Sequence, residues 1–156
     1  MKRLNSRQLP RRETLERQLG LLLDLLNEVA GPLRRESTAL WLSASEWYGR
    51  TAAQRGLAAG EIVEEFQHLR ELLIRHLSET VSTLPARKSL ASVLRLNRVL
   101  DSGIAHAVVG YTDVLVESIL DRQGIPVGAL GTAESEIETR LDQFERELAE
   151  LKELAV

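Results

Sequence analysis

The side chains best suited to chemistry in this sequence are its three histidines, His68, His76 and His106. A histidine can exchange a proton near neutral pH, accept a phosphoryl group or ligate a metal ion. Metal binding needs further ligands at matched spacing, and Glu64 does share a helical face with His68. One such pair is common on any helix, so the histidines predict no metal site.

His106 permits a sharper interpretation. The segment His106-Ala107-Val108-Val109-Gly110 resembles the reactive site of histidine-phosphotransfer domains, in which a lysine and a glycine follow the histidine. Val109 stands at the lysine position, so the developing negative charge of a phosphoryl group would lack its local partner. A phosphotransfer protein that uses His106 is therefore an alternative function.

Haem binding is a second alternative. A globin-type haem pocket needs an axial histidine that faces an apolar cavity, and the three histidines are candidates by residue type. The sequence contains two phenylalanines, Phe66 and Phe144, and Phe144 belongs to a different pattern described below. We therefore predict no cofactor, with a haem-binding globin-type sensor as the alternative.

The overall sequence predicts a non-enzymatic protein. No run alternates like a strand, so neither a phosphate-binding loop after a strand nor a nucleophile elbow is expected. The formal net charge of −3 argues against a nucleic-acid surface. The apolar run at residues 19–26 is too short to cross a membrane. Because cysteine is absent, we expect a soluble cytoplasmic protein.

Apolar residues recur at helical spacing along the chain, and glycine or proline separates the segments. We expect an all-α bundle of four main helices with a projecting C-terminal coiled-coil helix. The four main helices are expected over residues 13–30, 33–55, 59–80 and 86–122. The expected organisation is a flexible basic arm (1–12), a helical domain (13–122), a linker turn (123–131) and a C-terminal helix (132–156).

Two features inside these segments bear on packing. Trp41, Trp47 and Tyr48 lie close together in the second segment, where we expect them to fill the core. Gly103 and Gly110 lie inside the fourth segment. Each of them either permits the close approach of another helix or marks a bend.

The C-terminal segment carries a heptad pattern. Its apolar residues are spaced alternately four and three apart, which predicts that a second helix covers this edge. They are Ile137, Leu141, Phe144, Leu148 and Leu151, followed by Ala155. The expected cover is a second copy of the chain, and the alternative is that the helix docks on its own domain.

The charges beside this seam favour a parallel homodimer. In a parallel pair, Arg140 faces Glu145 of the partner and Glu147 faces Lys152 of the partner. Both pairings are opposite in sign, so they would set the register of the two helices.

A family resemblance lies in two stretches. Residues 56–73 contain a glycine turn that leads into a helix with Phe66, Leu69 and Arg70, and residues 96–112 form a second similar stretch. Together they resemble the N-terminal sensor domain of RsbR-type stressosome co-antagonists, which also precedes some bacterial histidine kinases.

The resemblance implies a dimeric, globin-like and usually haem-free domain. It also implies a C-terminal helix that leads to an output domain or partner of the kinase or STAS type. We therefore expect a non-enzymatic homodimer that senses a signal in bacterial stress response and binds neither nucleic acid nor membrane.

Overall fold

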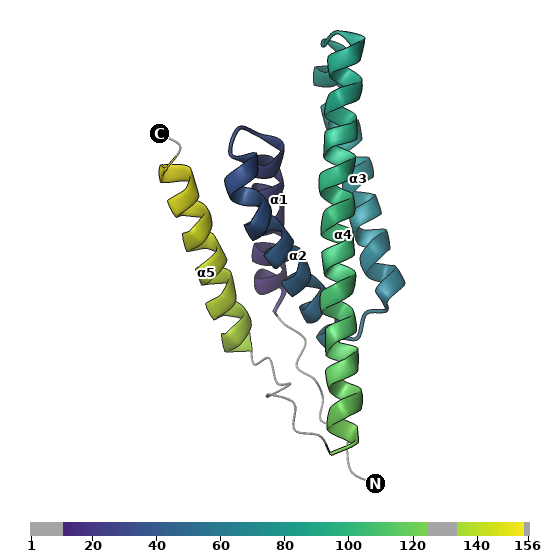
Figure 1. Ribbon diagram of the computed structural model, residues 1–156, viewed down its shortest axis with the longest axis vertical. Helices are drawn as coiled ribbons and strands as arrows, with labels where there is room; N and C mark the ends of the chain where they lie inside the picture. Colours follow the sequence, from purple (N-terminus) through teal and green to yellow (C-terminus); the bar gives the residue numbers. More distant parts are fainter. Residues whose placement is uncertain (1–10, 125–133, 155–156) are drawn as a thin grey trace.

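A computed structural model describes residues 11–124 and 134–154. These residues form five α-helices and no strand (Figure 1). The helices are α1 (Arg12–Ala30), α2 (Arg34–Arg55), α3 (Ala59–Ser82), α4 (Ala86–Arg122) and α5 (Glu134–Glu153). The all-α prediction is confirmed. Most of the expected basic arm (1–10) and of the linker turn (125–131) lies outside the described residues.

The closest contact between helices is the crossing of α2 and α4. A Cβ atom at Gly49 would lie 1.7 Å from the carbonyl oxygen of Ala107, and one at Gly110 would lie 2.0 Å from that of Glu46. No side chain fits at such distances, so each helix presents a glycine where the other helix's backbone passes. Of the two readings of Gly110, close approach is therefore correct.

The aromatic residues of α2 occupy the core, as predicted. Trp41 is fully buried, and its indole nitrogen donates a hydrogen bond to the carbonyl oxygen of Val99 on α4 at 3.1 Å. The Phe66 ring of α3 meets both Trp41 and Tyr48 edge-on, with ring centroids 6.5 and 5.8 Å apart. Edge-to-face contacts of this kind add to the burial of the rings. These rings join α2, α3 and α4.

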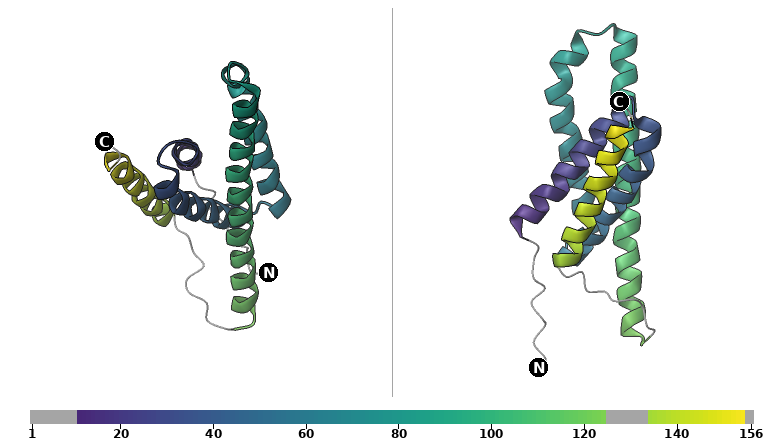
Figure 2. Two further views of the ribbon diagram at one scale, coloured as in Figure 1. Left: turned by 45° about the horizontal axis from the view of Figure 1, so that its top comes forward. Right: turned by 90° about the vertical axis from the view of Figure 1, so that its left-hand side faces the viewer.

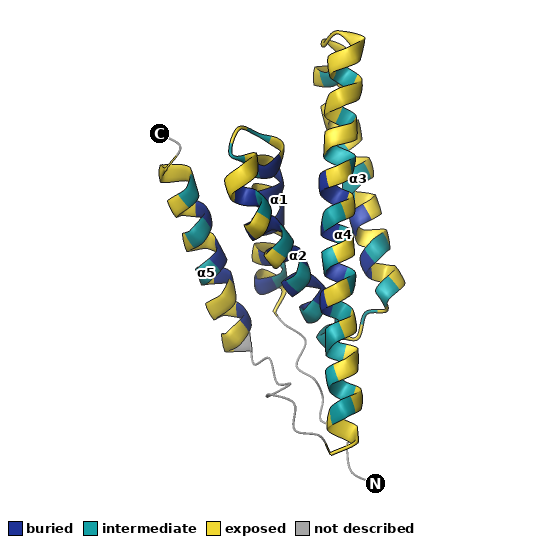
Figure 3. Cartoon of the chain, viewed as in Figure 1, coloured by how far each residue is buried: buried dark blue, intermediate teal, exposed yellow. Residues whose placement is uncertain are grey.

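The helices form three adjacent groups. α3 and α4 make a long antiparallel hairpin on one side, α1 and α2 lie in the middle, and α5 lies on the far side (Figures 1 and 2). α5 contacts α1 and α2 but neither α3 nor α4. The buried residues of each helix face its neighbours (Figure 3).

The expectation of a projecting C-terminal helix needs correction. α5 packs on α1 and α2 of its own chain (Figure 1), which is the alternative that the sequence left open. The physical reason is that an apolar stripe needs a cover, and α1 and α2 supply one without a second molecule.

The glycine crossing yields a stability prediction. Gly49→Ala should lower the free energy of unfolding by about 1–3 kcal/mol, because the added methyl group forces α2 away from α4. Gly20→Ala is the matched control, since nothing lies within 4 Å of a Cβ atom at this helical position. The control should raise stability by up to about 1 kcal/mol through helix propensity alone. Urea denaturation followed by circular dichroism measures both, and equal gains in both variants would contradict the close crossing.

Candidate functional site

The apolar seam of α5 is buried within the chain. Ile137, Leu141, Phe144 and Leu148 are all buried, and Leu151 is half-buried against them. Since α5 touches only α1 and α2 among the described helices, these two helices cover the seam. The surface made by α5 with α1 and α2 is called the α5 interface below.

Phe144 is the largest fully buried side chain that α5 contributes to the α5 interface. Its ring lies 5.7 Å from that of Trp47 on α2, centroid to centroid, at a tilt of 45°. The guanidinium of Arg140 lies over the Phe144 ring at 4.7 Å. Burying such a side chain contributes about 1.5–3 kcal/mol, so Phe144 holds α5 in place more strongly than any surface charge does.

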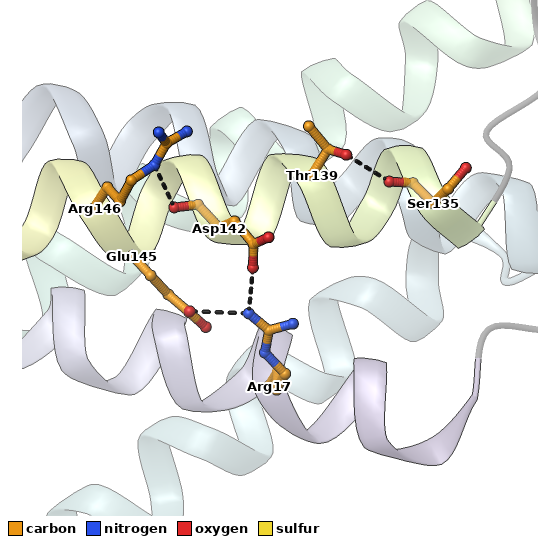
Figure 4. Close-up of polar contacts among 6 residues, drawn as sticks. All are labelled: Arg17, Ser135, Thr139, Asp142, Glu145 and Arg146. Atoms are coloured by element: carbon orange, nitrogen blue, oxygen red, sulfur yellow. Dashed lines mark hydrogen bonds and ion pairs between the residues drawn. The ribbon is translucent and has the colours of Figure 1, made fainter.

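Arg17 of α1 forms an ion-pair clamp on α5. One of its terminal nitrogens donates hydrogen bonds to Asp142 at 2.8 Å and to Glu145 at 2.9 Å (Figure 4). The bonds to Glu145 and then Asp142 raise the pKa of Arg17 further above its usual range. All three side chains are well exposed, and exposed pairs contribute at most about 1 kcal/mol. The clamp therefore sets the position of α5 more than its stability.

The other charges expected to set dimer register also find partners within the chain. Lys152 lies 3.7 Å from Glu28 of α1. Gln143 of α5 links two more of these charged residues. It accepts a hydrogen bond from Arg140 at 2.7 Å and donates one to Glu147 at 2.8 Å. The docked helix thus uses Arg140, Glu145, Glu147 and Lys152 internally, and their pairing across a dimer stays a prediction.

A small apolar cleft lies on the other side of α1. Its volume is about 160 Å³, and α1, α2 and α3 all contribute to it. It is lined by Leu19, Leu22, Leu23, Tyr48, Glu65, Phe66 and Leu69. The backbones of α1 and α3 do not approach each other closely, and the cleft lies between side chains of these two helices, over Tyr48 of α2. Its lining suits a small apolar molecule.

Tyr48 and Glu65 form the polar part of the cleft. The Tyr48 hydroxyl donates a hydrogen bond to the Glu65 carboxylate, and the Arg55 guanidinium lies 5.6 Å from the centre of the Tyr48 ring. Burial, with help from the bond to Glu65, raises the pKa of Tyr48 to about 12. The hydroxyl therefore stays protonated in the folded state over the physiological range.

α1 separates the cleft from the α5 interface. Arg17 and Glu28 of α1 reach α5, whereas Leu19 and Leu23 face the cleft. With about 100° of rotation per residue, these two sets lie on opposite sides of the helix. α1 therefore carries part of the cleft lining and part of the surface on which α5 docks.

The histidines do not converge on a site. His68 is exposed and its Nδ1 atom pairs with the Glu64 carbonyl oxygen at 2.9 Å, and His76 is also exposed. The Nδ1 atom of His106 lies 3.9 Å from the Glu46 carboxylate, whose charge would oppose a phosphoryl group. None of the three lines the apolar cleft, and the described residues contain no cluster suited to a metal ion.

A comparison with known protein families identifies the family of this chain. The family described as the RsbT co-antagonist protein rsbRD N-terminal domain matches residues 8–125. The chain belongs to this family. The resemblance found in the sequence is thereby confirmed. Neither a curated protein nor a solved structure matches the chain.

Membership of the rsbRD N-terminal domain family indicates a sensory or regulatory role of the stressosome type. Domains of this type work in complexes with partner proteins, and stressosome components are soluble and cytoplasmic. The family match covers α1–α4 and ends before α5. α5 therefore lies outside the residues that the family match covers.

Sequence reasoning did not identify the residues of the other helices that hold α5, or the polar pair of the cleft. Arg17 stands on a helix rich in charges, and nothing near it distinguishes it from Arg12 or Glu16. The Tyr48–Glu65 bond joins two helices at positions 17 apart. Neither contact can be recognised from neighbouring residues in the sequence, because each depends on how the helices pack after they form.

The α5 interface yields a prediction for Phe144. Phe144→Ala should weaken the docking of α5 by about 3–5 kcal/mol, since it removes a large buried ring. Amide hydrogen exchange over residues 134–153 should then rise by about a hundredfold or more. Thr139→Ala is the control, because Thr139 is exposed on α5 and bonds only the carbonyl oxygen of Ser135 (Figure 4). Unchanged exchange in Phe144→Ala would show that the seam does not hold α5.

The cleft yields a pH prediction for Tyr48. Its folded pKa of about 12 lies above the ordinary value of 10.0, so the unfolded chain loses the proton first as pH rises. The stability contributed by the protonated hydroxyl is complete below pH 10 and is lost between about pH 10 and 12. Ultraviolet titration of wild type minus Tyr48→Phe should show a phenol midpoint near 12. A difference midpoint near 10 would contradict the buried, bonded hydroxyl.

Proposed function

We propose that this chain is a non-enzymatic, homodimeric regulatory domain of the stressosome type, with α5 as its output element. A signal received by the four main helices changes how α5 docks, and α5 passes that change to an output domain or a partner protein of the kinase or STAS type. The globin-like arrangement implied by the resemblance belongs to the same proposal. The family's name, RsbT co-antagonist, makes RsbT one partner to test.

The observation that carries this proposal is the position of α1 between the cleft and the α5 interface. Leu19, Leu22 and Leu23 line the cleft, while Arg17 clamps α5. Only a rigid helix separates the two surfaces. A rigid element with a different contact on each side is a physical means of coupling two sites.

α5 is suited to move because few contacts hold it. Four buried apolar side chains and a small set of ion pairs attach it to α1 and α2. Elements with small interfaces open most readily in a native protein. Release would uncover the heptad seam, which could then pair with a helix of a partner or with a second α5.

The cleft is the proposed point of input. Its volume of about 160 Å³ is close to that of cavities that bind benzene-sized molecules. A ligand would have to bind the two states of α5 with different affinity in order to shift their balance. Contact with Leu19 and Leu23 would supply that difference by displacing α1.

Neither alternative function is favoured by the geometry. The carboxylate of Glu46 lies beside His106, where phosphotransfer would need a cation. Haem would need a histidine in the apolar cleft, and the cleft is lined by leucines, Tyr48, Glu65 and Phe66. A regulatory domain without a cofactor requires neither feature.

The coupling predicts the effect of filling the cleft. Leu19→Trp places a larger side chain at the cleft mouth, where Leu19 is half-exposed, and it should displace α1 as a ligand would. Amide exchange over residues 134–153 should rise by severalfold, corresponding to about 1 kcal/mol of weakened docking. Mass spectrometry of deuterium uptake measures the change.

Leu84→Trp is the matched control, since Leu84 is exposed at the far end of the α3–α4 hairpin. It should leave uptake in α5 unchanged. Equal uptake in wild type and in Leu19→Trp, with the added tryptophan shown by fluorescence to be buried, would rule out coupling through α1.

A further inference from the structure

The C-terminal half of α4 carries an uncharged stripe that none of the described helices covers. Its members recur every seven residues, as 105, 112 and 119, as 108 and 115, and as 109 and 116. They are Ala105, Val108, Val109, Thr112, Leu115, Val116 and Ile119, called the α4 stripe below. Val109, Val116 and Ile119 are 50%, 48% and 53% exposed. Such a continuous apolar surface marks an interaction site.

We propose that the α4 stripe binds the α4 stripe of a second copy, antiparallel, with the two-fold axis beside Thr112. The inference rests on the homodimer of the proposed function and assigns it a surface. This surface differs from the seam of α5, which α1 and α2 already cover.

The spacing of the stripe fits a helix as its occupant. A seven-residue repeat keeps one edge of a helix facing a partner helix over its whole length. The hydroxyl of Thr112 donates to the Val108 carbonyl oxygen at 2.8 Å within α4, so its burial would leave no unmet donor. α5 does not fill this place, because it makes no contact with α4.

The sizes of the side chains fit an antiparallel pair of identical helices. A two-fold axis at Thr112 brings Ala105 against Ile119 of the second copy. It likewise brings Val108 against Val116 and Val109 against Leu115 of the second copy. The smallest member then meets one of the largest, which fills space evenly. A parallel pair would instead set alanine against alanine at one end and isoleucine against isoleucine at the other.

The charges at the ends of the stripe favour the same direction. Asp101 precedes the stripe and Arg122 follows it, and both residues are exposed. Antiparallel pairing brings Asp101 of each copy close to Arg122 of the other, whereas parallel pairing sets like charges together. Asp101 also bonds Arg70 of α3, which leaves its carboxylate able to accept a second cation.

Cysteine cross-linking of the full chain tests the register, because the chain has no cysteine of its own. Thr112→Cys alone should form a disulfide-linked dimer on mild oxidation. A mixture of Ala105→Cys and Ile119→Cys should form the mixed dimer. Neither should link to itself, since each pair of identical positions would lie about 21 Å apart, at about 1.5 Å per residue, and a disulfide needs Cα atoms within about 7 Å. Self-linking of Ala105→Cys would overturn the antiparallel register.

Light scattering distinguishes a failure of the α4 surface from a failure of the homodimer itself. Wild type should be dimeric, and Val109→Glu with Val116→Glu should be monomeric yet fully helical, because both side chains are exposed in one copy. Leu148→Cys should not cross-link while α5 is docked. A dimer that survives the double substitution would overturn the α4 surface but retain the homodimer, whereas a monomeric wild type would overturn both.

A membrane surface is the competing occupant to exclude. α4 is long and apolar enough to cross a membrane by composition, and only 22% of its most apolar window is buried. This property is weak by itself, because helices of soluble proteins share it. Sedimentation with phosphatidylcholine–phosphatidylglycerol vesicles should leave wild type in solution. Vesicle binding that Val109→Glu with Val116→Glu abolishes would overturn the proposal in favour of lipid.

Discussion

The close crossing of α2 and α4 is the constraint on which the rest of the structure depends. With Gly49 and Gly110 each under the other helix's backbone, no large side chain fits between α2 and α4 at their crossing, and the aromatic residues of α2 pack beside it. Trp41 meets Phe66 of α3, Trp47 meets Phe144 of α5, and Tyr48 borders the cleft. One helix thereby organises three neighbours, and any displacement of α2 from α4 reaches each of them.

Apolar contact and charge have different roles where α5 docks. Burial of the seam supplies the attraction, since it scales with the area removed from water. The ion pairs of Arg17 are exposed, so salt screens them and their energy is small. In the pair of Lys152 with Glu28, the glutamate is largely covered. These ion pairs fix where along α1 the helix sits. Docking of this kind is therefore specific in position.

Much of this fold was predictable from local patterns, and its helix–helix contacts were not. Helical spacing and glycine or proline breaks place the ends of α4 correctly, at Ala86 and Arg122. The heptad of α5 correctly indicates an edge that needs a cover, but the same apolar residues satisfy a partner chain or α1 and α2 equally well. Arg17 has no signal at all, because its two acids lie 125 and 128 residues away. α4 is apolar on several sides, so the spacing of its apolar residues does not show which face the other helices leave uncovered.

The two heptad surfaces of this chain impose a choice on the proposed homodimer. α5 runs broadly along α4 with α1 and α2 between them (Figures 1 and 2). A two-fold axis perpendicular to α4 reverses its direction and therefore reverses α5 as well. In such a dimer the docked α5 helices point opposite ways on the outer sides of the two subunits, so a parallel α5 pair cannot form until both helices are released. In the proposed dimer, docking therefore keeps the two α5 helices apart.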